Sequence, residues 1–158
     1  MFDILEYRQR LSRLQQKIQA SELDVFVVRA NANIIYLTGV DYDSEERKVL
    51  LIVPAQGKPS LIVPRMELER LSAAVTVEQV ISYWEMDAKS GRGWVELLHD
   101  SLGTAQRVGI EATLEADVIA ELNQYQWSVS SALEDVRLIK SSSEIALTRR
   151  IAGYWTTA

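Results

Sequence analysis

The stretch KVLLIVPAQGKPSLIVP, residues 48–64, decides the fold of this chain. It contains two apolar runs, residues 49–53 and 61–63, and each run is followed by Pro. The polar residues 55–59 between them include a Gly, which tolerates positive φ, and a Pro, which cannot continue a strand. β-branched runs joined by a short turn of this chemistry predict an antiparallel hairpin.

The first strand of this hairpin does not alternate with polar residues, so we expect both of its faces to be buried. Burial on both faces requires helices on both sides of the sheet. The hairpin is therefore predicted at the centre of an α/β fold with a mixed, partly antiparallel sheet of about five to six strands and helices on both faces. Further strands are predicted over residues 23–28, 76–84, 107–111 and 127–130, and helices over residues 4–20, 31–39, 65–74, 94–102 and 113–124.

The predicted helix over residues 4–20 is amphipathic. Leu11, Leu14 and Ile18 share one face, which we expect to lie on the sheet. The polar face is expected to carry Arg8, Arg10, Arg13, Gln15 and Gln16.

Helix-terminus signals mark two other segments. Asn31 or Asn33 is expected to cap the short helix that follows residues 23–28, and Gly39 is expected to close it in a left-handed conformation. Ser141 and Glu144 have the Ser-x-x-Glu spacing of a capping box and predict a helix near the end of the chain. That helix carries Tyr154 and Trp155 without a stop signal, which indicates a helix that is cut rather than finished; a natural terminus is the alternative.

Composition bounds the function. A chain of 158 residues, 47% hydrophobic and 25% charged, is typical of one soluble globular domain. The net charge of -5 leaves no basic stripe for nucleic acid, and no apolar run reaches the roughly 18 residues of a membrane span. Without Cys there are no disulfides, thiol nucleophiles or thiolate metal sites, which fits a cytoplasmic location.

Catalytic motifs are scarce. His99 is the only histidine, so an imidazole metal site lacks partners, and we interpret it as a surface or packing residue. Neither a dinucleotide-binding glycine motif nor a phosphate loop is present. Four acids, Asp41, Asp43, Glu45 and Glu46, are interpreted as a solvated acidic loop, with acid–base catalysis as the alternative.

Arg47 follows these acids and directly precedes the buried hairpin, so its backbone is fixed while its side chain reaches the loop. Its guanidinium could bind a ligand carboxylate through two hydrogen bonds, or it could pair with Glu45 or Asp43. Tyr36, Tyr42 and Trp84 either line the lip of a pocket or lie half-buried over the sheet.

Two segments resemble those of a known family. NIIYLTG, residues 33–39, is similar to the Asn-Ile-x-Tyr-Leu-Thr-Gly segment near the start of creatinase/prolidase (Xaa-Pro peptidase) proteins. VRLIKSSSEIALTRR, residues 136–150, resembles the junction where the N-terminal domain of that family meets the catalytic domain. Their order and their separation by roughly one domain make the resemblance specific to this family's N-terminal domain.

This resemblance implies a domain with a ribonuclease H-like motif over residues 1–135, and a linker and first helix over residues 136–158. It implies that the catalytic domain lies outside this chain and there holds two divalent metal ions (Mn, Co or Zn), so no metal ligand or catalytic residue is expected here. The parent would be a homodimeric metallopeptidase of the Xaa-Pro dipeptidase or aminopeptidase class acting on small peptides, and this domain, inactive alone, would aid dimerisation and gate the neighbouring subunit's active site.

The resemblance also implies substrate contacts. Arg47 matches in position an arginine that meets the substrate carboxylate in creatinases, and Asp41 or Asp43 would suit the amino group of a dipeptide. Together with Tyr36 these are the candidate substrate-binding residues. A stand-alone binding or dimerisation module, and the N-terminal domain of a creatinase-like hydrolase of small amides, are the alternatives.

Overall fold

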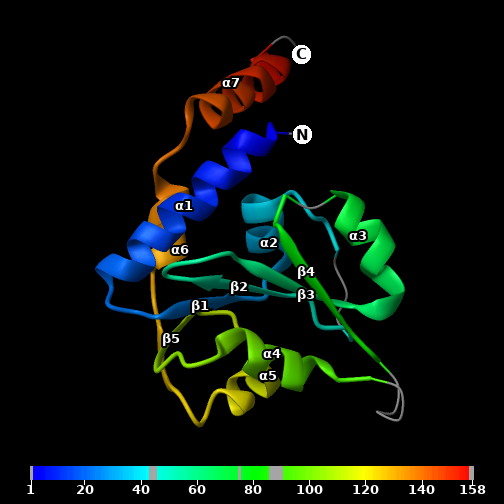
Figure 1. Cartoon of the computed structure of the whole chain (residues 1–158). Coiled ribbons are helices and arrows are strands. Elements are labelled where there is room, and N and C mark those ends of the chain that lie inside the picture. Colours follow the sequence, from blue (N-terminus) through cyan, green and yellow to red (C-terminus); the bar gives the residue numbers. More distant parts are fainter. Residues whose placement is uncertain (1, 43–45, 75, 86–90, 157–158) are drawn as a thin grey trace.

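The fold is a six-stranded mixed sheet between two layers of helices (Figure 1). It is seen in a computed structural model that describes residues 2–42, 46–74, 76–85 and 91–156. The strands are β1 (Val25–Val28), β2 (Leu50–Pro54), β3 (Ser60–Pro64), β4 (Gln79–Tyr83), β5 (Arg107–Ile110) and β6 (Gln126–Val129), in the spatial order β4-β3-β2-β1-β5-β6.

The predicted hairpin is confirmed as β2 and β3, which pair antiparallel with Leu51 opposite Leu61. β2 also pairs antiparallel with β1, whereas the β3–β4, β1–β5 and β5–β6 pairs are parallel. β2 is therefore the one strand that runs against the other five. β2 and β1 are the two central strands of the sheet. The first strand of the hairpin is therefore central, and its second strand, β3, is the next strand outward.

Helices cover both faces of the sheet, as the buried character of β2 predicts. One face is covered by α1 (Ile4–Ala20), α2 (Asn31–Thr38), α3 (Leu68–Ala74) and α6 (Ala132–Leu138), and the other by α4 (Trp94–Leu102) and α5 (Ala116–Glu121). A 3-10 turn, η1 (Arg65–Glu67), precedes α3, and α7 (Ser142–Thr156) projects beyond the sheet beside the N-terminal end of α1 (Figure 1). Among the described residues no helix is both long and apolar enough to cross a bilayer.

Two details of the predicted helices are wrong. α2 begins after Ala30, and neither Asn31 nor Asn33 caps it, because both side chains bind partners elsewhere in the fold. Arg10 does not lie on a solvated face of α1; it is only 2% exposed. Gly39 closes α2 with φ of 77°, as predicted.

α6 is a helix that the sequence analysis does not predict. Its Ala132, Leu133 and Val136 are buried in the same core as α1 and the sheet. The predicted division between residues 135 and 136 falls inside this helix, so the packed unit runs through α6. α7 begins with the predicted capping box: the Glu144 N–H donates to Ser141 Oγ at 3.1 Å, and the Ser141 N–H donates to Glu144 Oε2 at 2.8 Å.

Candidate functional site

The candidate site is the edge of the sheet at the carboxyl ends of the five strands that share one direction. Ligands of open α/β sheets bind outside this edge. Arg29 follows β1, Glu85 follows β4 and Glu111 follows β5, while Arg47 and Lys48 precede the oppositely directed β2. Strand direction thus gathers charged residues from distant parts of the chain.

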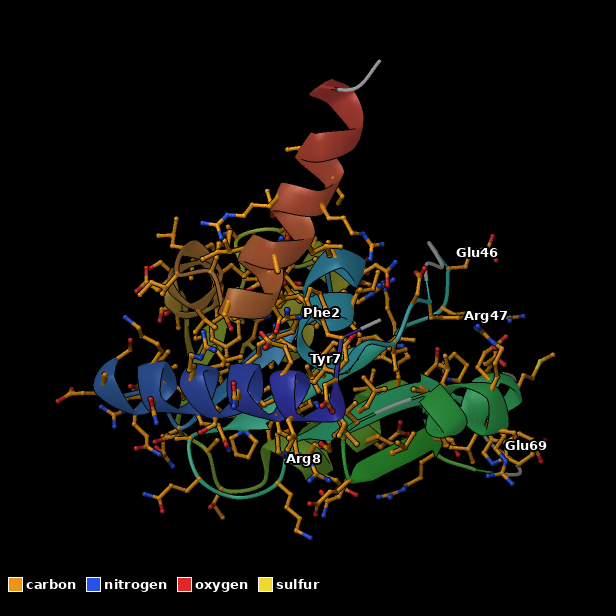
Figure 2. All side chains as sticks on the ribbon, turned by 90° about the horizontal axis from the view of Figure 1, so that it is seen from above. Phe2, Tyr7, Arg8, Glu46, Arg47 and Glu69 are labelled. Atoms are coloured by element: carbon orange, nitrogen blue, oxygen red, sulfur yellow. The ribbon has the colours of Figure 1, made fainter. Side chains whose placement is uncertain are left out.

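Arg47 lies in this edge as part of an ion pair. Its Nε is 2.6 Å from Glu85 Oε1, and its Nη1 is 3.8 Å from Glu67 Oε1. A hydrogen bond with Tyr42, together with the nearby Glu85 carboxylate, raises the pKa of Arg47. The side chain is 40% exposed, so the guanidinium is oriented by protein groups and also open to solvent. Figure 2 shows it on the side of the molecule that carries α3.

Lys48 and Arg29 form a second, more buried charge cluster next to Arg47. Lys48 Nζ pairs with Glu115 and lies 2.8 Å from Asp117 Oδ2, and Arg29 Nη2 lies 3.3 Å from Glu115 Oε1. Burial lowers the pKa of Lys48, but its hydrogen bonds to Asp117 and Glu115 outweigh that effect, so the net shift is upward. Arg29 Nη2 also donates to the Arg47 carbonyl at 3.4 Å, which links the two groups of charges.

Glu111 is the most deeply buried acid of this edge, at 1% exposed. Its Oε1 accepts hydrogen bonds from the N–H groups of Arg29 and Ala30, and its Oε2 accepts one from Asn33 Nδ2 at 2.6 Å. A buried carboxylate needs such donors to offset its lost hydration. Glu111 therefore holds the ends of β1 and β5 and the start of α2 together.

Each predicted site residue that the structure describes contacts other groups of the protein, as Arg47 does with Glu85. Asp41 is exposed, and its Oδ1 accepts a hydrogen bond from Asn31 Nδ2 at 3.1 Å. Tyr36 lies between α1 and α6, where the Arg10 guanidinium stacks on its ring and its hydroxyl donates to the Val136 carbonyl at 3.5 Å. Asp43, and the proposed Arg47 partner Glu45, lie outside the described residues.

His99 sits away from this edge. Its Nδ1 is 3.0 Å from the Tyr125 hydroxyl, and the two rings are stacked. This is a packing arrangement on α4. Within the described part of the chain, no group of three or more His, Cys, Asp or Glu side chains could hold a metal ion.

The partners of Arg47 and Lys48 are the part of the site that sequence reasoning missed. Glu67, Glu85, Glu115 and Asp117 lie in other elements and carry no local signal. Only the strand order, together with the edge rule for parallel strands, would have brought them together.

Comparison with known proteins assigns this chain to a family. The sequence profile of the Creatinase/Prolidase N-terminal domain matches residues 10–151. The chain belongs to the creatinase/prolidase N-terminal domain family. The resemblance seen in residues 33–39 and 136–150 is thereby confirmed, and the mixed six-stranded α/β sheet is the fold of this family.

Solved and curated proteins agree with this membership. The dipeptidase PepE from Mycobacterium ulcerans has the same fold at 22% identity, with a TM-score of 0.77 over 92% of this chain and 40% of that one. A proline dipeptidase from Streptococcus pneumoniae is 28% identical, with a TM-score of 0.71 over 82% of this chain and 98% of that one.

A curated relative from Staphylococcus epidermidis, described as an uncharacterized peptidase, is 23% identical over 147 residues, which are 91% of this chain and 40% of the relative. This creatinase/prolidase N-terminal domain therefore spans about two fifths of the length of these curated relatives.

Proposed function

We propose that this chain is the non-catalytic N-terminal domain of a dinuclear metallohydrolase of the Xaa-Pro dipeptidase or aminopeptidase type. The observation that carries the proposal is the family match over residues 10–151. Relatives named as peptidases, of which the chain spans about 40%, support it. In this proposal the domain helps to form a homodimer and gates the active site of the neighbouring subunit.

The two divalent metal ions belong to the following domain in this proposal. The described residues of this chain do not offer a ligand set for them. The contribution of this chain to the reaction is to position and select the substrate.

Arg47 is the residue that we assign to substrate selection. Its guanidinium already holds the Glu85 carboxylate at 2.6 Å, while 40% of the side chain is exposed. Because this part of the side chain faces solvent, a substrate carboxylate could approach the guanidinium and form charge-assisted hydrogen bonds with it beside Glu85. Asp41 and Asp43, on the adjoining loop, would receive the substrate amino group.

A substrate pair separates this role from a purely structural ion pair. The protein that contains this domain and its catalytic partner is assayed with an Xaa-Pro dipeptide and with the C-terminal amide of the same dipeptide. Loss of a hydrogen bond to a charged group is expected to lower kcat/KM of Arg47→Ala about 10- to 100-fold for the free acid. The amide lacks the charge, so its kcat/KM should change far less.

Arg65→Ala is the matched control. Arg65 is an exposed arginine at the same edge of the sheet whose Nη1 donates to Ser82 Oγ at 3.4 Å, so its removal takes away the same charge. It should leave both substrates unaffected. Equal losses on acid and amide in Arg47→Ala would reject the assigned role.

A further inference from the structure

Arg10 is a buried cation that lies outside the proposed substrate-binding site. It lies in α1 and is 2% exposed. Its Cζ is 4.3 Å from the centroid of the Phe2 ring, 5.5 Å from that of Tyr7 and 4.2 Å from that of Tyr36. Three aromatic rings from two separate segments thus surround one guanidinium, an arrangement in which each face attracts the cation.

The polar atoms of Arg10 join three helices. Nε donates to Glu6 Oε1 at 3.2 Å within α1, and Nη1 donates to the Tyr36 carbonyl of α2 at 2.8 Å. Nη2 lies 3.6 Å from Glu144 Oε1 in α7, and it makes no hydrogen bond to any of the described residues. A buried guanidinium is destabilising without charged partners, so the Glu144 carboxylate helps to offset the cost of burying Arg10.

Glu144 uses its two oxygens for different purposes. Oε2 accepts the Ser141 N–H in the capping box that starts α7, while Oε1 faces Arg10. From Ile145 to Gly153 the residues of α7 are exposed. Glu144, in the first turn of α7, is therefore a point at which the helix is held to the body of the domain. Figure 2 shows Phe2 and Tyr7 at the end of α1 that lies beside this turn.

We propose that Arg10 is a positioning residue that fixes the direction in which α7 leaves the domain. The same guanidinium holds the last turn of α2, which leads through Gly39 into the loop that carries Asp41. One buried cation thus positions both the start of the loop that carries Asp41 and the first turn of α7. The statement that α7 leads into a catalytic domain rests on the proposed function. The statement that Arg10 orients α7 is independent of it.

The absence of cysteine from the sequence makes a direct test possible. Spin labels on Gln16→Cys in α1 and Arg149→Cys in α7, both exposed sites, report the distance between the two helices. The parent protein with these labels should give one narrow distance distribution. Arg10→Met and Glu144→Gln should each broaden it about twofold or more, because α7 then samples several directions.

The two variants complement each other. Arg10→Met can fail to fold because it alters a buried group, whereas Glu144→Gln keeps the capping box, since Gln also serves at that position. Lys17→Met is the matched control, because Lys17 lies on the same helix as Arg10 and forms an exposed pair with Asp135 of α6, at 3.5 Å. It should leave the distribution narrow.

An unchanged distribution in Glu144→Gln would overturn the proposal, as would a broad distribution already present in the parent. This readout does not depend on peptide hydrolysis, so failure of the proposed function and failure of this inference are told apart.

Discussion

Asn33 donates a hydrogen bond from Nδ2 to Oε2 of Glu111 at 2.6 Å, and both side chains are buried. Asn33 Oδ1 in turn accepts a hydrogen bond from Arg137 in α6. The first residue of the family segment NIIYLTG therefore connects the end of β5 to α2 and α6. Its role is structural: it supplies one of the donors that make a buried carboxylate stable.

Asn33→Ala should destabilise the domain. Removal of the amide leaves Glu111 Oε2 buried without its donor, and hydrogen bonds to charged groups contribute about 1.5–3 kcal/mol. Urea denaturation should show a loss of that size. Asn123→Ala, at an exposed position, is the control and should change stability by less than about 0.5 kcal/mol. Equal effects from the two substitutions would contradict the assigned role of Asn33.

Gly109→Ala should also destabilise the domain, through crowding in the core. A Cβ at Gly109 in β5 would lie 2.6 Å from Leu23 Cδ1 and 2.7 Å from Phe26 Cδ2. Overpacking of this kind costs about 1–3 kcal/mol, which thermal unfolding can measure. Gly153→Ala in α7 is the control, since its Cβ would meet nothing within 4 Å. If Gly109→Ala is as stable as Gly153→Ala, the close approach of β5 and Phe26 is wrong.

Much of this fold could be predicted because its signals are local. The bounds of α1 and α4 follow from apolar spacing, and the β2–β3 hairpin follows from its turn residues. α6 could not be predicted from the sequence because Ala132–Leu138 is short, contains three charged residues and has no Gly or Pro at its ends. The burial of Arg10 is not predicted from helical spacing, because Phe2 lies outside the helix and Tyr36 is brought to α1 only by the tertiary fold.

Tyr83 should make the stability of the domain sensitive to alkaline pH. Burial raises the pKa of Tyr83 to about 12, whereas an unfolded tyrosine ionises near pH 10. The unfolded state then loses this proton first, so the contribution of Tyr83 is complete below pH 10 and is lost as pH rises from about 10 to 12, with a slope of at most about 1.4 kcal/mol per pH unit.

Tyr83→Phe should remove this component of the alkaline slope. It also removes the acceptor of the Lys48 N–H, which bonds to the Tyr83 hydroxyl at 2.9 Å, so the variant should be about 1 kcal/mol less stable at pH 8. Urea denaturation at pH 8 and pH 11 measures both effects. Parallel pH curves for the two proteins would show that Tyr83 ionises as it does in the unfolded chain.

Asp24 gives the opposite pH dependence. Its Oδ2 accepts the N–H groups of Gln106 and Arg107, each at 2.8 Å, and these two hydrogen bonds hold its pKa below the usual value of 3.8. The stabilisation is present above about pH 4 and is lost as pH falls through the lowered pKa. Asp24→Asn should therefore be less stable than the parent at pH 7, and the difference in stability should narrow as pH falls below about 4. A gap that persists unchanged at low pH would contradict this.

The candidate site was less predictable than the fold. Arg47 could be singled out because it stands between an acidic loop and a buried strand. Its partner Glu67 comes from η1 and reaches it through the β2–β3 hairpin. Its partner Glu85 follows β4 and reaches it because β4 lies parallel to β3. The pairing of β4 with β3 cannot be predicted from the spacing of residues in the sequence.

Incubation of the purified 158-residue chain with an Xaa-Pro dipeptide and Mn²⁺ or Co²⁺ tests most directly whether this domain is non-catalytic. We predict that free proline is released no faster than by the metal ion alone. Proline release that rises in proportion to the concentration of the chain, and that EDTA abolishes, would contradict the assignment of this chain as a domain without chemistry of its own.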